Sequence, residues 1–166
     1  MRNKRRILAV AGLAVLWLAG AGSPATGVAD DVRRTTDALL QGGSSGPGDV
    51  RATLRHLLEV AADLGREARL AAPAQAKLDA ALAEARRLSP LDAAVRAKAA
   101  EAYAALDQGR AFAFPKEVAS IEQAKAYGRG QVDRALAALS AGRPQEAARE
   151  LVGLVLLVIT PMERPQ

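Results

Sequence analysis

Two residue counts limit the chemistry that this sequence can perform: its 166 residues include one histidine, His56, and no cysteine. The lack of cysteine excludes disulfide bonds, thiolate metal sites and cysteine nucleophiles. A Ser-His-Asp set would have to use His56, and a carboxylate-bridged di-iron bundle needs two Glu-x-x-His units, which the sequence lacks. We therefore predict a protein that is not an enzyme, with no catalytic residues and no metal site.

The single histidine is expected to lie on the outer face of its helix. At about 100° per residue, His56 points nearly opposite the apolar stripe that contains Leu54 and Leu57. We expect a solvated side chain that pairs with Glu59 or Glu67, and not a ligand to a metal or a general base.

Two lysines are less easily explained. Lys98 falls between Val95 and Ala102 on the expected inner side of its helix, and Lys125 falls between Ile121 and Val132 on the next helix. Facing one helix seam, the two amines would hold an anionic small ligand. The alternative, which we favour, is that their stems cover apolar surface while the ammonium groups reach water.

The N-terminus has the three-part layout of a secretory signal. A basic cluster at 2–6 precedes an apolar stretch at 7–18, and small residues follow up to a cleavage motif at 27–29. The apolar stretch falls short of the ~20 residues that cross a bilayer. We expect an exported protein of the periplasm or exterior with a leader at 1–29. The alternative is an uncleaved leader that anchors the protein to the inner membrane through residues 7–18.

The formal charge of +5 is concentrated in this leader. Four of the 23 basic residues lie at positions 2–6, and no acidic residue precedes Asp30, so 19 basic and 18 acidic residues remain. The remainder of the chain is close to neutral, which predicts that nucleic acid is not a partner.

The rest of the sequence favours an all-α fold. Half of the residues are hydrophobic but only 3% are aromatic, a mixture that suits helices better than strands. We predict an antiparallel bundle of four to five main helices over residues 49–162, after a short helix and a Gly/Ser/Pro linker at 30–48. One of the helices is expected over residues 116–141.

Residues 74–107 form either one kinked helix or two helices. We favour two, because Ser89 supplies an N-cap and Pro90 a first-turn proline. Further along the chain, Gly128 and Gly130 would weaken a helix unless a kink or a close neighbour requires them. Phe112 and Phe114 are expected to plug the end of the bundle.

The last helix, expected over residues 144–160, is apolar on all sides from Leu151 to Ile159. Such a helix is buried centrally or lies in a partner interface, in that order of preference. The interface alternative involves a protein or envelope component, or a homodimer. Its candidate residues are Leu151, Leu154, Val155 and Val158.

Residues 130–154, GQVDRALAALSAGRPQEAARELVGL, resemble the last helical hairpin of the cytochrome b562 family of periplasmic four-helix haem proteins. The resemblance implies a bundle that binds haem b and transfers electrons. In that family, a methionine early in the first helix and a histidine near the end of the last helix bind the iron. The histidine position falls at or near Met162, so haem binding would require the swapped pair of His56 and Met162.

We therefore predict an exported, non-enzymatic helical module that binds a protein or envelope partner and holds no cofactor. Two alternatives stay open. One is a haem-binding electron-transfer bundle, and the other is an anionic small-ligand binder that uses Lys98 and Lys125.

Overall fold

The computed structural model describes residues 24–41 and 47–162, and every regular element within them is an α-helix. The predicted all-α class is therefore confirmed. Residues 1–23 of the predicted leader at 1–29 lie outside the described residues, as do linker residues 42–46 and the terminal residues 163–166, whereas leader residues 24–29 form the start of α2. The described helices are α2 (Pro24–Leu40), α3 (Pro47–Glu67), α4 (Ala72–Arg87), α5 (Ala93–Leu106), α6 (Ile121–Ser140) and α7 (Pro144–Ile159).

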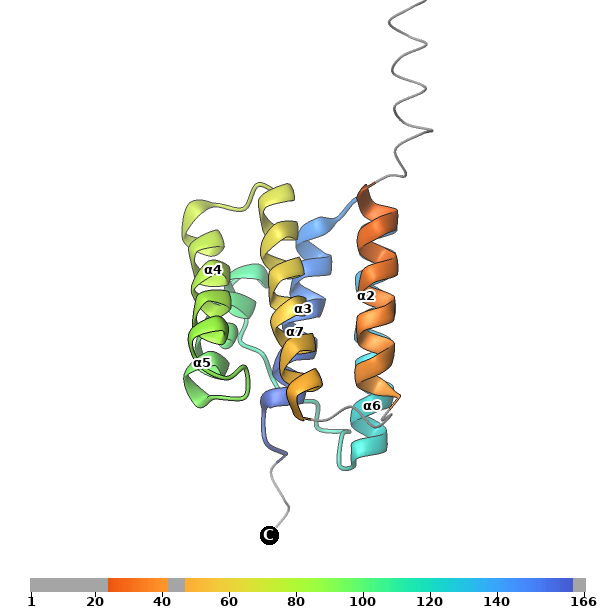
Figure 1. Ribbon diagram of the computed structural model, residues 1–166. Helices are drawn as coiled ribbons and strands as arrows, with labels where there is room; N and C mark the ends of the chain where they lie inside the picture. Colours follow the sequence, from red (N-terminus) through yellow and green to blue (C-terminus); the bar gives the residue numbers. More distant parts are fainter. Residues whose placement is uncertain (1–23, 42–46, 163–166) are drawn as a thin grey trace, which may run out of the picture.

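The helices form two four-helix groups that share α3 and α7 (Figure 1). α3 packs against α2, α4 and α7, while α7 packs against α3, α5 and α6. The α4–α5 pair completes one group, and the α2–α6 pair completes the other. The shared helices consequently have neighbours on more than one side.

This shared position explains the apolar sequence of α7. Every residue from Leu151 to Leu157 is buried, including Gly153. Central burial, the first of the two predicted roles for this helix, is therefore confirmed. Full burial of a side chain such as Leu154 stabilises the fold by roughly 1.5–3 kcal/mol relative to an exposed position.

α6 and α7 form a tight hairpin whose turn depends on Gly142. This glycine has φ +70°, a left-handed conformation that closes a helix at little cost only for glycine. Gly128 of α6 lies against two other helices: a Cβ there would be 3.0 Å from Leu40 Cδ2 and 3.2 Å from Leu154 Cδ1. Close approach, one of the two predicted reasons for the helical glycines, therefore applies to Gly128.

Residues 74–107 contain two helices, as favoured, but the predicted cap is wrong. α5 begins at Ala93, and its N-cap is Asp92, whose carboxylate accepts a hydrogen bond from the Ala94 amide at 2.8 Å. Ser89 instead starts a turn in which its carbonyl accepts a hydrogen bond from the Asp92 amide at 2.9 Å. The Ser-Pro pair stops α4, but one further turn separates it from α5.

The connection from α5 to α6 spans residues 107–120 and follows the length of the bundle (Figure 1). Its two phenylalanines are partly buried against the core, and Phe112 meets the Tyr103 ring edge-on at 5.4 Å between centroids. The helix predicted from residue 116 begins only at Ile121. Its N-cap is Ser120, whose hydroxyl accepts a hydrogen bond from the Gln123 amide at 3.2 Å.

α2 belongs to the bundle and not to a separate segment before it. Val32 is fully buried and Leu40 is 6% exposed, and both lie in the common core. Thr36 is also buried, and its hydroxyl donates to the Val32 carbonyl at 2.7 Å. The predicted start of the bundle at residue 49 is therefore too late, because α2 packs on α3 and α6.

Within residues 24–41 and 47–162, no helix combines the length and the hydrophobicity that crossing a membrane requires.

Candidate functional site

The structure does not bring the two predicted lysines together. Lys98 lies on α5 and Lys125 on α6; both helices pack on α7, but they do not pack on each other. Lys98 is exposed, so its predicted inward position is wrong. The buried stripe of α5 passes through Val95, Ala99, Ala102 and Leu106. Lys98 precedes Ala99 by one residue, and this rotation of about 100° turns it out of the seam.

Lys125, by contrast, lines an apolar groove. Its side chain is 26% exposed, and its amine lies 3.3 Å from a carboxylate oxygen of Glu122, which is 82% exposed. The stem of Lys125 therefore covers apolar surface, as expected of a lysine whose ammonium group reaches water.

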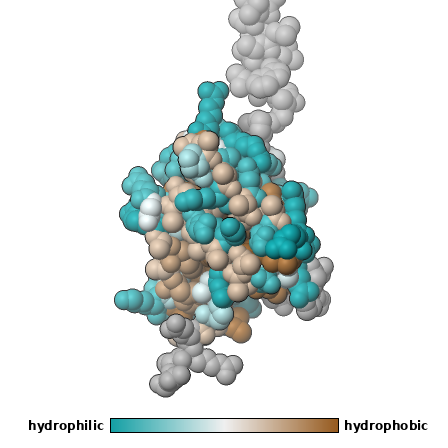
Figure 2. All heavy atoms as spheres, turned by 90° about the vertical axis from the view of Figure 1, so that its left-hand side faces the viewer, coloured by the Kyte–Doolittle hydropathy of each residue, from teal (hydrophilic) through white to brown (hydrophobic). Residues whose placement is uncertain are grey.

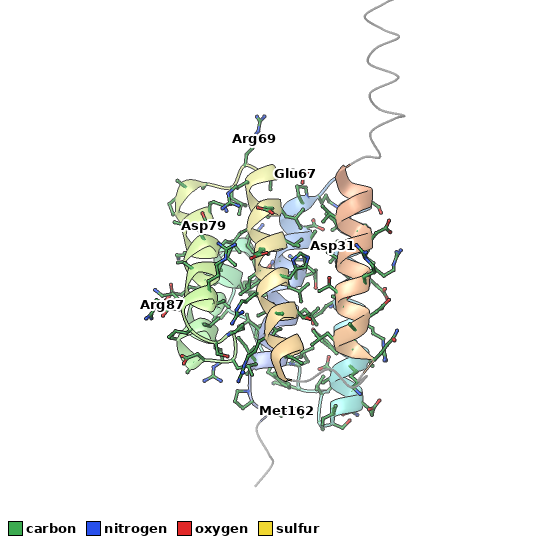
Figure 3. The ribbon with its side chains drawn as sticks, viewed as in Figure 1. Asp31, Glu67, Arg69, Asp79, Arg87 and Met162 are labelled. Atoms are coloured by element: carbon green, nitrogen blue, oxygen red, sulfur yellow. The ribbon has the colours of Figure 1, made fainter. Side chains whose placement is uncertain are left out.

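The groove, called the end groove below, is a hollow of about 360 Å³ at the end of the bundle where α2 and α7 finish and α6 begins. A second hollow of about 880 Å³ adjoins it and shares Phe114, Ile121 and residues 160–162. Met162, labelled in Figure 3, lies at this lower end of the molecule. The lining of the end groove comprises Leu39, Leu40, Phe114, Ile121, Ala124, Lys125, Leu157, Val158, Thr160, Pro161 and Met162.

Large apolar side chains are exposed to solvent in this groove. Ile121 is 64% exposed and Met162 is 38% exposed. Ile121 was predicted on the inner face of its helix, but it is the first residue of α6, where no neighbouring helix covers it. Thr160, the residue before Pro161, is extended, as residues before proline usually are, so α7 ends at Ile159 and Met162 beyond it also lines the groove.

The charge of the lining is one-sided. Lys125 in the end groove and Lys116 in the adjoining hollow are the ionisable residues that line the two cavities, and no carboxylate of the described residues lines either. Thr160 and Ser120 add hydroxyl groups. The site therefore combines an apolar wall with two amines.

The predicted partner-interface residues separate into two groups. Leu151, Leu154 and Val155 are at most 1% exposed and face the interior, so they offer no surface to a partner. Val158 is partly exposed and lines the end groove. On the side of the molecule formed by α4 and α5, hydrophilic and apolar side chains are mixed (Figure 2).

His56 takes part in a chain of charges that joins three helices. Its Nε2 lies 2.5 Å from Asp31 Oδ2 on α2, and its Nδ1 lies 3.7 Å from Glu59 Oε2. Glu59 in turn accepts a hydrogen bond from Arg86 of α4 at 2.9 Å, which holds its pKa below the usual value. The predicted pairing with Glu59 is confirmed, whereas Asp31 was missed because α2 was not expected to pack on α3.

The swapped haem ligands lie apart. Figure 3 places Asp31, the partner of His56, beside the middle turns of α3, and Met162 at the lower end of the bundle. Among the described residues, there is also no group of three or more His, Asp or Glu side chains that could hold a metal ion.

A polar cleft of about 570 Å³ lies at the opposite end of the bundle, beside Gly142 and the start of α7. Three arginines line it, but each already pairs with a carboxylate: Arg110 and Arg149 with Asp107, and Arg143 with Glu146. The carboxylates that balance these arginines line the cleft with them, whereas Glu122, the partner of Lys125, lies outside the end groove.

No protein-family model, curated protein or solved structure matches the chain. The resemblance of residues 130–154 to the cytochrome b562 family therefore stays a prediction.

Proposed function

We propose that this chain is an exported helical module that binds an apolar partner through the end groove. The observation that carries this proposal is the cluster of solvent-exposed apolar side chains at one end of the bundle, led by Ile121 and Met162. Covering side chains of this size removes apolar surface from water and stabilises a complex by about 1–3 kcal/mol for each one that is fully buried.

The chemistry of the lining supports binding more than catalysis. The end groove offers apolar carbon, one hydroxyl from Thr160 and one amine from Lys125. The histidine, the residue used most often for general acid–base catalysis, is engaged with Asp31 on another part of the surface. The groove volume falls within the roughly 300–1,000 Å³ that is typical of small-molecule sites.

The position of the groove also fits an exported protein. The predicted leader at 1–29 includes the first six residues of α2, whereas the groove lies beside Leu39 and Leu40 at the other end of that helix. The 17 residues of α2 extend about 25 Å at ~1.5 Å per residue. Cleavage after residue 29 would shorten α2 at the end that lies farthest from the groove and would leave Leu39 and Leu40 in place.

A neutral solvatochromic dye such as Nile red tests the proposal with the full chain purified from the envelope fraction. We expect saturable binding of one dye per chain, reported by a rise in fluorescence. Ile121→Glu should weaken this binding about tenfold or more, because it places a charge on the apolar lip.

Leu91→Glu is the matched control for this variant, because Leu91 is also an exposed large hydrophobic residue, 42% accessible, but lies outside the groove. It should leave dye binding unchanged. Non-saturable binding, or equal losses in both variants, would contradict the proposal.

A further inference from the structure

We infer that the ligand of the end groove is a fatty acid: a single apolar chain that lies along the groove wall and carries a carboxylate that pairs with Lys125. This inference rests on the proposed function, because it names the ligand class for the same site. The ligand has an anionic head, which the charge of the lining favours, and a single alkyl chain, which the shape and polarity of the lining favour.

The anionic head follows from the one-sided charge. Lys125 and Lys116 line the two adjoining hollows, and no carboxylate of the described residues does so. A cationic ligand head in the end groove would meet the like charge of Lys125, whereas a carboxylate would meet an opposite one. α6 also begins at this point, and the positive end of its dipole lies on the same side.

Lys125 is available for this role although it has a neighbouring carboxylate. Its contact with Glu122 is an i,i+3 pair on one helix, and Glu122 is 82% exposed and outside the lining. Such exposed pairs contribute only about 0.2–0.5 kcal/mol. A ligand carboxylate held beside the apolar wall is less well solvated than Glu122, so it competes effectively for the amine.

The single chain follows from the shape and polarity of the wall. A bound peptide must satisfy its backbone N–H and C=O groups, but Thr160 is the polar uncharged residue that lines the end groove. A helical peptide is about 10–12 Å wide with its side chains, and it would present a face of several turns to a hollow of about 360 Å³. An alkyl chain has no backbone polar groups to satisfy and fits a narrow apolar wall.

The experiment measures displacement of Nile red from the full chain by three ligands with the same twelve-carbon chain: dodecanoate, dodecanol and dodecyltrimethylammonium. All are used below the concentrations at which they aggregate. We expect dodecanoate to bind at least about tenfold more tightly than the cationic ligand, with dodecanol between them. Shortening the fatty acid should weaken binding by about fourfold for each methylene removed.

Lys125→Met keeps an apolar stem and removes the charge. This variant should bind dodecanoate about tenfold more weakly and bind dodecanol with unchanged affinity. Lys125→Arg should retain the preference for the anion. Lys98→Met is the control, because Lys98 is an exposed lysine of α5 outside both hollows.

The outcomes separate this inference from the proposed function. If Nile red binds and Ile121→Glu abolishes its binding, but the three ligands compete equally or Lys125→Met has no effect, the fatty-acid assignment is wrong and the groove proposal stands. The assignment is equally wrong if an apolar peptide displaces the dye and dodecanoate does not. If neither dye nor amphiphile binds, both are wrong.

Discussion

At the scale of single residues, the contacts of His56 link α2 and α4 to α3. Asp31 and Arg86 approach the same two residues of α3, His56 and Glu59, from opposite sides. The side chains of His56, Asp31 and Glu59 are each between one third and two fifths exposed, so solvent screens these pairs. These contacts therefore contribute little to net stability.

Glu59 makes this pairing dependent on pH. The hydrogen bond from Arg86 lowers the pKa of Glu59 below its usual 4.5, so the folded state favours the charged carboxylate. The stabilisation is present above pH 4.5 and is lost as the pH falls through the lowered pKa. Glu59→Gln should cost about 0.2–1 kcal/mol in urea unfolding at neutral pH, and this difference should vanish in acid. A difference that is unchanged in acid would contradict this origin.

Tyr103 provides a test at the alkaline end. Burial raises its pKa above the usual 10.0, and the nearby Asp107 carboxylate adds to the effect. Since the folded state disfavours the phenolate, stability is full below pH 10 and falls as the pH rises further. The ultraviolet titration of tyrosinate in Tyr127→Phe, which leaves Tyr103 as the remaining tyrosine, should show a midpoint above that of free tyrosine. A midpoint at or below the free value would contradict the burial.

The sequence predicted the residues of the site only in part. The sequence identified Lys125 as a candidate ligand-binding residue because it breaks an apolar pattern. The structure places Lys125 in the lining of the end groove. Lys98 was misplaced because Val95 and Ala102, seven residues apart, lie on one side of the helix without showing whether Lys98 or Ala99 joins them there. The burial of Ala99 shows that the apolar stripe passes through Ala99. Ile121 and Met162 could not be recognised, because exposure at a helix end depends on what the neighbouring helices cover.

At the scale of elements, the two glycines of α6 have different environments. A Cβ on Gly128 meets Leu40 at 3.0 Å and Leu154 at 3.2 Å, whereas one on Gly130 meets only the flexible end of Arg134 at 3.4 Å. Gly130→Ala should therefore stabilise the fold by about 1 kcal/mol through helix propensity.

Gly128→Ala should gain less than Gly130→Ala or destabilise the fold, because α2 and α7 leave little room for a methyl group. Thermal unfolding of the two variants side by side measures the difference. Equal gains in both would mean that α2 does not approach α6 as closely as described.

α2 is the element whose role the sequence predicted least well. Its helical spacing was visible, but a run of Gly, Ser and Pro after it suggested a separate segment. In the fold, α2 nevertheless packs onto α3 and α6. The pairing of α6 with α7 was predictable, in contrast, because Gly142 and Pro144 are local signals.

Val32→Ala tests whether α2 is part of the core. Val32 is fully buried, so the loss of two methyl groups should lower the free energy of unfolding by about 2 kcal/mol. Arg33→Ala, next to it on the exposed side of α2, should have an effect below about 0.5 kcal/mol. A negligible cost for Val32→Ala in urea unfolding would show that α2 is detached.

At the scale of the whole molecule, the two ends of the helical bundle differ in the residues that line their hollows. One end carries the arginine-lined cleft, where Asp107 and Glu146 line the site beside their arginine partners. The other carries the end groove, which no carboxylate of the described residues lines, because Glu122, the partner of Lys125, lies outside it. The fold class and the buried last helix were predictable, because composition and all-round hydrophobicity determine them. The groove was not, because it forms where the ends of three helices and a connection meet.

The most direct test of the end groove as a binding site is methyl NMR of the full chain during titration with dodecanoate. The sequence contains three isoleucines and two methionines, so few signals need assignment. Ile121 and Met162 line the groove, whereas Ile159 is 7% exposed and does not. The proposed site predicts that the Ile121 and Met162 methyl signals shift together and saturate at one ligand per chain, with a smaller change at Ile159. Saturable binding that leaves the Ile121 and Met162 signals in place would contradict it.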